Sequence, residues 1–364
     1  MLKSSTKEFL DLKSPLSLVR EMRDNNYNQF SSELWTEMVE MGWTALTIPE
    51  EYNGLNFGYV GLGQVLEEMG RKLTVSPIIS TVLTSTSLIS LSKNEILKNK
   101  LFQEIMNGNK LCTLAHEEGS HHSPNIEISI VSKKDDVLVL NGKKRFVIDG
   151  SISDYFIVSA NHKSEKNVDL ILVDSKSEGI SFNNKVHMDS RIYSDISFDN
   201  VKIQKDNFLS SNGDGFEILE KTLDIARIGL SAEMLGNVQQ AFEMTMQYLK
   251  EREQFGVKIG SFQSLQHRSA LMFGEIELCK SIVLKALQAI DFDDEKLPEL
   301  ASLAKAKLGQ VSKLVTNEAV QMHGGIGVTD DADIGFFLKR TRVTQRTFGD
   351  SNFHLDRVAK INKY

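Results

Sequence analysis

Cysteine is scarce in this sequence. Cys112 and Cys279 are its only two cysteines, and they lie far apart in a chain of 364 residues. Neither belongs to a CxxC pair, which argues against a disulfide framework and against a thiolate zinc site. The pattern predicts a protein of a reducing compartment, the cytoplasm.

Long apolar segments are lacking as well. Residues 1–13, MLKSSTKEFLDLK, contain no apolar stretch like that of a signal peptide. The least polar run, residues 75–91, includes Pro77 and several serines and threonines. We interpret it as a buried helix of a soluble protein and expect no membrane span.

Excess positive charge is also absent. The formal net charge is −7, whereas a nucleic-acid-binding protein is usually basic. Hydrophobic residues make up 41% of the chain and charged residues 25%, which is typical of a soluble globular protein. The length is sufficient for two or three domains, and no internal repeat is visible.

The periodicity of apolar residues divides the chain into three parts, which we place at residues 1–110, 111–209 and 210–364. The first part has a helical pattern, with Ser31 or Ser32 as an N-cap and a second helix near 62–69 that Gly70 ends. The third part is helical again, with one helix over about 299–322 and a last one that begins near Ser351.

The middle part is rich in short β-type runs. Asn141-Gly142 between two apolar runs predicts a hairpin with a type I′ turn. Further strands are expected at 155–159, 170–173 and 196–198, in a small antiparallel domain or barrel. The predicted fold is mainly α with an inserted β domain.

Two stretches of the third part combine polar groups that can hold an anion with glycines that let the backbone approach a ligand. They are residues 248–266, YLKEREQFGVKIGSFQSLQ, and residues 321–327, QMHGGIG. Together they predict a bound dinucleotide.

These stretches, with NGKKRFVIDG at 141–150 and FGDSNFHLDRVA at 348–359, resemble the acyl-CoA dehydrogenase family in the same order and over nearly the whole chain. The resemblance implies an N-terminal helical domain, a central antiparallel β domain and a C-terminal four-helix bundle. It also implies FAD as cofactor, an acyl-CoA thioester as substrate and a trans-2-enoyl-CoA as product.

The resemblance assigns residues to the cofactor at matching positions. The FAD contacts, some donated to the flavin of a neighbouring subunit, are Arg252, Phe255, Gln263, Gln321, Gly324 and Gly325. An arginine suits this role because its planar fork pairs with phosphate oxygens. The alternatives are a solvated charged helix face around Arg252 and a helix C-cap at the glycines.

Asp224 and Arg227 match family positions that contact the CoA portion of the substrate. Residues three apart on a helix project from one face, so both could reach one ligand. An ordinary ion pair between them is the alternative.

The catalytic position departs from the family pattern. Asp350 stands where the commonest members have a glutamate, so its carboxylate is drawn back by about one C–C bond, roughly 1.5 Å. A displacement of that size can cost on the order of 100-fold in rate. Other members carry the base on the helix of Arg227, but that position is Ala226 here. Either Asp350 is the base or the chain has none of its own.

The positions that would face the chain's own flavin differ too. His116 and its neighbours replace the family's TEPxAGSD, and Ile148 replaces a threonine. His116 and His121 are five apart and form no HExxH, so we expect a variable loop and no metal.

The residues expected to contact the flavin of a neighbouring subunit therefore match the family pattern. Those expected to contact the chain's own flavin differ from it. We expect a homo- or hetero-oligomer built as a dimer of dimers, with an α2β2 assembly of two related chains as one form, and an electron-transfer flavoprotein as acceptor. A non-catalytic partner subunit and a relative that performs other thioester chemistry, such as hydration, are the alternatives. The FGDSNFH ending and the short length resemble branches of the family that act on steroid side chains and form α2β2 heterotetramers, in which each chain supplies part of the site.

Overall fold

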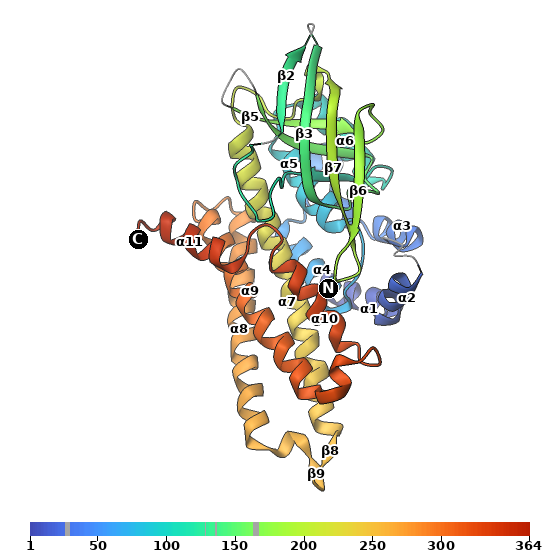
Figure 1. Ribbon diagram of the computed structural model, residues 1–364, viewed down its shortest axis with the longest axis vertical. Coiled ribbons are helices and arrows are strands. Elements are labelled where there is room, and N and C mark those ends of the chain that lie inside the picture. Colours follow the sequence, from blue (N-terminus) through green and yellow to red (C-terminus); the bar gives the residue numbers. More distant parts are fainter. Residues whose placement is uncertain (26–29, 128, 135–136, 163–166) are drawn as a thin grey trace. The chain divides into compact units, whose positions relative to one another are not determined.

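The computed structural model describes residues 1–25, 30–127, 129–134, 137–162 and 167–364 (Figure 1). Two compact units are formed from interleaved segments of the chain. Unit 1 comprises residues 1–24, 59–74 and 227–364, and unit 2 comprises residues 25–58 and 75–226. Each unit is described by itself.

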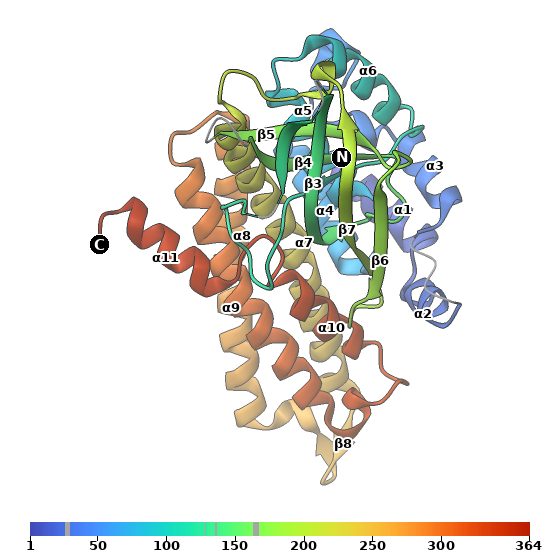
Figure 2. The ribbon, with the colours of Figure 1, turned by 45° about the horizontal axis from the view of Figure 1, so that its top comes forward.

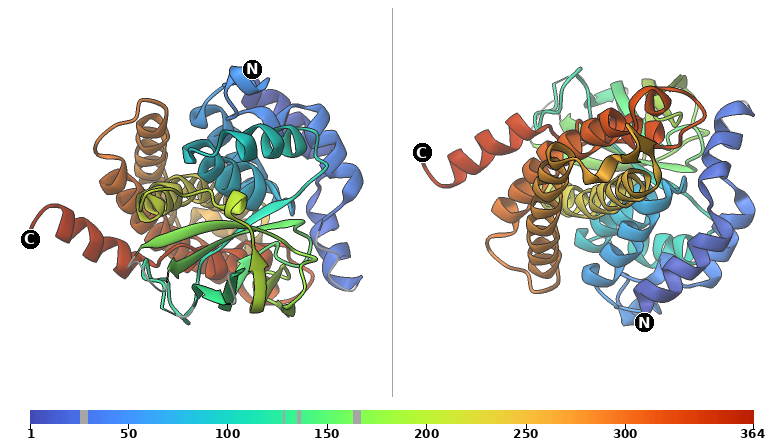
Figure 3. Two further views of the ribbon diagram at one scale, coloured as in Figure 1. Left: turned by 90° about the horizontal axis from the view of Figure 1, so that it is seen from above. Right: turned by 90° about the horizontal axis from the view of Figure 1, so that it is seen from below.

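Unit 1 is helical. Its long helices lie side by side, and a short two-stranded hairpin, β8 (Glu253–Gln254) with β9 (Val257–Lys258), lies at one end of them (Figure 1). The helices are α1 (Leu2–Lys13), α2 (Leu16–Asp24), α4 (Tyr59–Lys72), α7 (Gly215–Glu251, whose first residues belong to unit 2), α8 (Gln263–Asp291), α9 (Leu297–His323), α10 (Ile334–Thr344) and α11 (Ser351–Ile361). The last helix projects sideways from the others, with the C-terminus at its tip (Figure 3).

Glycines bring α4 and α7 into close contact. A Cβ on Gly70 would lie 2.0 Å from the carbonyl oxygen of Glu233, and one on Gly236 would lie 1.7 Å from that of Glu67. Only glycine allows backbones to approach so closely. Gly70 therefore does not end its helix, as the sequence suggested, but lies inside α4, which continues to Lys72.

Unit 2 contains α3 (Ser32–Glu40), α5 (Thr86–Leu91) and α6 (Glu95–Met106). Of the two predicted N-caps, Ser31 is the one that caps α3, and its side chain accepts a hydrogen bond from the amide of Leu34. The weakly polar run is a buried π-helix, η3 (Ile78–Ser85), that continues into α5. Its hydroxyls bond carbonyls five residues back, Thr84 to Ile79 and Ser85 to Ser80, which satisfies polar groups that would otherwise be buried without partners.

The described part of unit 2 also contains a seven-stranded curled sheet (Figure 2). Its path is β1-β4-β2-β3-β7-β6, and β5 pairs with β4. The pairing is mainly antiparallel, but β1 and β2 each run parallel to β4. The strands are β1 (Cys112–Ala115), β2 (Ile130–Lys134), β3 (Val137–Ile148), β4 (Tyr155–His162), β5 (Val168–Asp174), β6 (Ile180–Val186) and β7 (Ile192–Ile203). Buried side chains such as Val158, Ile171 and Ile196 form one hydrophobic cluster on it.

The hairpin predicted at Asn141-Gly142 is wrong. Strand β3 runs through both residues, and its register against β7 shifts between Leu140 and Gly142. A Cβ on Gly142 would lie 2.5 Å from the Cα of Ser129, so the glycine permits a bulge where a neighbouring chain segment passes close. The antiparallel partner of β3 on this side is the preceding strand β2.

Within the described part of the chain, none of the helices combines the length and apolar character that crossing a bilayer requires.

Candidate functional site

The first predicted dinucleotide-binding stretch, residues 248–266, is not one continuous helix. Helix α7 ends at Glu251, and the chain turns back through Phe255 and Gly256, both at positive φ, into β9. Lys258 pairs with Glu253 at 2.6 Å across this hairpin. The charged residues 251–253 are therefore not one helix face, because Arg252 and Glu253 lie beyond the helix.

Side chains of this hairpin are presented outward. Phe255 is 91% exposed, and its ring contacts that of Phe262 edge-on at 6.2 Å between centroids. Arg252 is exposed and forms no ion pair among the described residues, and Gln263, at the start of α8, is exposed as well. An exposed aromatic ring and an exposed guanidinium on one hairpin are groups that could contact a ligand or another chain.

The second stretch forms a turn at the same end of unit 1. Helix α9 ends at His323, whose ring stacks on Tyr248 of α7 at 4.5 Å and whose carbonyl accepts a hydrogen bond from the Tyr248 hydroxyl. Gly324 follows at φ +66°, and a Cβ added to it or to Gly325 would meet no atom within 4 Å. The backbone of this turn is thus open to an approaching group, and Gln321 one turn earlier is exposed.

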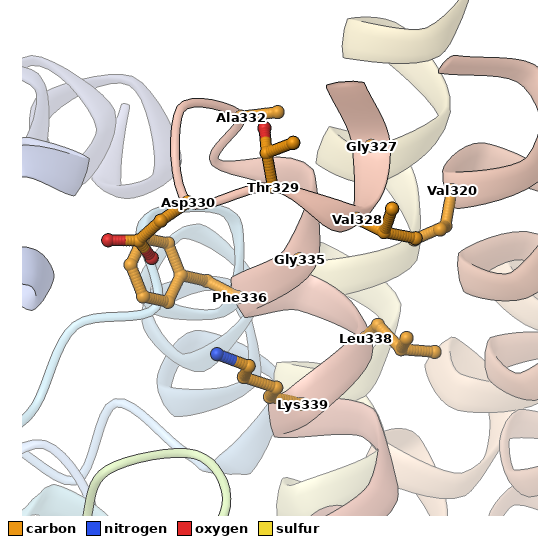
Figure 4. Close-up of a pocket in the computed structure, with 10 residues that line it drawn as sticks. All are labelled: Val320, Gly327, Val328, Thr329, Asp330, Ala332, Gly335, Phe336, Leu338 and Lys339. Atoms are coloured by element: carbon orange, nitrogen blue, oxygen red, sulfur yellow. The ribbon is translucent and has the colours of Figure 1, made fainter. Parts of the chain in front are cut away.

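A hollow of about 360 Å³ adjoins the glycine turn (Figure 4). Gly327 and Val328 line it from the turn, and Phe336 and Lys339 line it from α10. Asp330 at its edge is paired with Arg23 of α2 at 2.6 Å. The lining is largely apolar with one charge of each sign.

The donor set at this end of unit 1 fits part of an FAD molecule. A guanidinium without an ion-pair partner suits a pyrophosphate, open glycine amides suit its close approach, and exposed rings suit an apolar or aromatic portion. The six predicted cofactor residues thus gather at one end of the helices, although nothing in the described part of this chain covers them.

The predicted base occupies a capping position. Asp350 is the N-cap of α11, and its Oδ1 accepts a hydrogen bond from the amide of Phe353 at 2.9 Å. The residue is exposed, so its second carboxylate oxygen can face a ligand. The cap also gives Asp350 a structural role that the sequence comparison with glutamate did not reveal.

Asp224 and Arg227 both lie on α7 and are buried, at 2% and 0% exposure. The guanidinium of Arg227 donates from Nε to the carbonyl oxygen of Phe348 at 3.2 Å and lies over the ring of Phe353 at 5.6 Å. Arg227 thus contacts the turn that carries Asp350. The CoA contact of these two residues stays a prediction.

The His116 segment of unit 2 is a loop, as expected, but its first side chain points inward. The ring of His116 is buried, with Nδ1 at 3.0 Å from Ser159 Oγ and Nε2 at 2.9 Å from the carbonyl oxygen of Ser123. Burial lowers the pKa of His116 to about 4, so the ring is neutral at pH 7.

A buried ion pair fixes the same segment. Lys144 of β3, with no exposed surface, donates to Glu118 Oε1 at 2.7 Å and to the carbonyl oxygen of His116 at 3.1 Å. The carboxylate of Glu118 also accepts hydrogen bonds from the amides of Glu127 and Ser129. Burial lowers the pKa of Lys144 to about 8, although Glu118 opposes this shift.

Ligand atoms of His116, Glu117 and His122 lie within 4.8 Å of one another. The protein itself engages them, because His122 Nδ1 bonds Glu117 at 2.5 Å and both nitrogens of His116 have the partners given above. This geometry favours a hydrogen-bonded cluster, and the expected absence of a metal stays a prediction.

The sequence reasoning missed Lys305, which lies beneath the Asp350 turn. Its Nζ donates to the carbonyl oxygens of Gln345 at 3.2 Å and Gly349 at 2.9 Å. The sequence does contain a pattern that could have indicated it. Ser302, Ala306 and Gly309 form a helix face of small residues, and Lys305 lies on that same face.

Comparison with known families covers almost all of the chain. Residues 1–109 match the acyl-CoA dehydrogenase N-terminal domain, residues 113–201 the middle domain and residues 213–362 the C-terminal domain.

Individual relatives agree. The chain is 31% identical to a 3-(aryl)acrylate reductase of Clostridium sporogenes over 86% of each chain. It is 26% identical to the mitochondrial short/branched chain specific acyl-CoA dehydrogenase of Bos taurus, over 99% of this chain and 84% of that protein. The ChsE4–ChsE5 complex of Mycobacterium tuberculosis contains a chain with the same fold, with a TM-score of 0.90, 19% identity, and coverage of 100% of this chain and 96% of that chain.

Proposed function

Because the chain belongs to the acyl-CoA dehydrogenase family, we propose that it is a subunit of an FAD-dependent enzyme that moves hydrogen across the Cα–Cβ bond of an acyl-CoA thioester. The observation that carries this proposal is the exposed set around Arg252, Phe255 and Gly324, which fits part of an FAD molecule and lies open on the surface of the described chain. Acyl-CoA to 2-enoyl-CoA is the proposed direction.

The chemistry needs two groups on opposite sides of the substrate. The α-hydrogen of a thioester is weakly acidic, so its removal requires a positioned carboxylate. Bound FAD would accept the β-hydrogen as hydride. In our proposal Asp350 takes the α-proton through the carboxylate oxygen that does not cap α11, and Arg252 holds the pyrophosphate.

The same groups also serve the reverse reaction, since a base that removes a proton can return it. A reductase of Clostridium sporogenes is among the relatives, so both directions should be assayed, with a saturated acyl-CoA and with a 2-enoyl-CoA.

The first prediction concerns Asp350→Asn. Asparagine caps helices as well as aspartate does but does not accept the proton, so the fold should be kept. The rate of flavin bleaching by acyl-CoA should fall at least ~100-fold with FAD content unchanged, as measured by stopped-flow absorbance.

Asp356→Asn is the matched control, because Asp356 lies on the same helix, is exposed and pairs with Lys360, away from the Asp350 turn. It should bleach at the wild-type rate. A colourless protein that takes up no FAD, alone or with chains encoded beside it, would disprove the proposed function.

A second candidate, a non-catalytic subunit that completes another chain's site, is favoured by the His116 cluster. Its polar atoms are bonded to one another at positions where the family contacts its own flavin. On this hypothesis Asp350→Asn would leave the activity of a co-expressed complex intact.

The assembly we propose is a dimer of dimers, either of identical chains or of two related chains, with an electron-transfer flavoprotein as electron acceptor. Both cysteines are buried thiols, in keeping with a cytoplasmic enzyme of lipid metabolism.

A further inference from the structure

The turn between α10 and α11, residues 345–350, has an uncommon backbone. Phe348 has φ +59° and Gly349 has φ +106°, so two successive residues lie in the left-handed half of conformational space. A non-glycine residue in this region is strained by on the order of 1 kcal/mol or more and persists only when its surroundings hold it. Asp350 follows directly, so its direction depends on this turn.

Three buried side chains from three helices hold the carbonyl groups of the turn. Lys305 of α9 donates to Gln345 and Gly349, as given above. Arg227 of α7 and His354 of α11 both bond the carbonyl oxygen of Phe348, at 3.2 Å from Nε and 3.1 Å from Nε2. None of the three has exposed surface.

Lys305 is the most unusual of the three. It forms no ion pair among the described residues, and a buried ammonium group without a carboxylate partner is unfavourable. Burial first and the charge of Arg227 second lower the pKa of Lys305 to about 7, while Asp350 opposes the shift. A neutral amine still has two hydrogens for the two carbonyls, so the contacts persist on either side of that pH.

Small residues on the surrounding face of α9 let the start of α11 approach closely. The carbonyl oxygen of Ala306 accepts a hydrogen bond from the hydroxyl of Ser351 at 3.2 Å, and a Cβ on Gly309 would lie 2.3 Å from the same hydroxyl. The start of α11 therefore rests on small residues, and Lys305 is the long side chain of α9 that reaches under the turn.

We propose that Lys305 is a positioning residue of the active site: by holding the carbonyls of Gln345 and Gly349, on either side of Phe348, it fixes where the carboxylate of Asp350 lies. The proposal rests on the proposed function. The position of the turn matters more for an aspartate than for a glutamate, because a side chain one methylene shorter has less freedom to correct a backbone displacement.

Lys305→Met tests the proposal, since methionine keeps the length and removes the donors. Hydrogen exchange followed by mass spectrometry should show amides in residues 345–354 exchanging at least ~10-fold faster. With FAD content and KM within ~3-fold of wild type, kcat should fall ~10- to 100-fold.

Lys307→Met is the control. Lys307 lies on the same helix but pairs with Glu275 at 2.5 Å, away from the turn. It should match the wild type in exchange and in kcat. Equal exchange and kcat in the two variants would overturn the positioning role.

A second variant guards against a failure to fold. Lys305→Gln keeps an NH₂ donor and should lie between Lys305→Met and wild type in both measurements. If neither variant folds while Lys307→Met does, Lys305 is needed for folding and the positioning role is wrong. The exchange readout needs no turnover, so an inactive wild type with faster exchange in Lys305→Met would refute the proposed function alone.

Discussion

At the scale of single residues, the structure contains basic side chains whose complete burial the sequence did not predict. Arg227 and Lys305 lie without exposed surface beneath one turn, and Lys144 is equally buried in the other unit beside Glu118. Each is bonded to backbone carbonyls or to a carboxylate, as buried charged groups require. The sequence indicates none of this, because a lysine among helical residues normally lies on a solvated face.

Lys305 should make stability depend on pH. Its pKa is about 7 when folded and near 10.5 when unfolded, so between these values the unfolded chain binds more protons and stability rises with pH. Relative to Lys305→Met, the wild-type free energy of unfolding should rise by up to about 1.4 kcal/mol per pH unit from pH 7 to pH 10. Urea titrations at several pH values measure this slope.

Lys307→Met serves again as the control and should keep the wild-type slope, since the ammonium group of Lys307 is partly exposed. Parallel pH profiles for wild type and Lys305→Met would show that Lys305 stays protonated throughout.

At the scale of elements, the decisive feature is how closely helices approach. The α4–α7 contact depends on Gly70 and Gly236, and the contact of α9 with the start of α11 depends on Gly309. A buried bidentate pair, Arg340 with Glu233 at 2.8 Å, ties α10 to α7. These contacts fix the helices between which the Asp350 turn is held.

Gly236→Ala should destabilise unit 1. The added methyl group would lie 1.7 Å from the Glu67 carbonyl oxygen, so α4 must shift, at a cost of roughly 1–3 kcal/mol or more. Gly274→Ala on α8 meets no atom within 4 Å and should instead stabilise by up to about 1 kcal/mol. Thermal unfolding of both variants gives the comparison, and a neutral Gly236→Ala would contradict the close approach.

At the scale of the whole molecule, the proposed function predicts a site that is completed between chains. A base on one chain and a phosphate-binding arginine from its neighbour would explain why Arg252 and Phe255 are left uncovered by the described part of their own chain.

Complementation tests this arrangement. Asp350→Asn and Arg252→Met chains, each impaired alone, should recover about a quarter of wild-type activity when co-expressed, because half of randomly formed dimers are mixed and each mixed dimer has one intact site. Differently tagged chains allow the mixed assemblies to be isolated and assayed.

In the control, Lys250→Met takes the place of Arg252→Met. This substitution also removes an exposed charge at the end of α7, but no cofactor contact is predicted for Lys250. It should be fully active alone. No recovery with Arg252→Met would place both residues in one chain's site or in an assembly with a different chain.

Local patterns in the chain were enough to predict the order of helical and β-rich parts, an N-cap at Ser31 or Ser32, a last helix that begins near Ser351 and the family. These follow from local periodicity, from capping chemistry and from motifs that are contiguous in the chain. The family match also indicated which residues would meet the cofactor.

The remaining features depend on contacts between distant parts of the chain. The tertiary structure placed Gly70 inside a helix and Gly142 inside a strand, because their role is set by a backbone that approaches from elsewhere in the chain. It likewise brought Lys305, Arg227 and His354 to one turn from three helices. Such contacts join residues distant in sequence, and no local pattern specifies which backbone carbonyl a buried donor will meet.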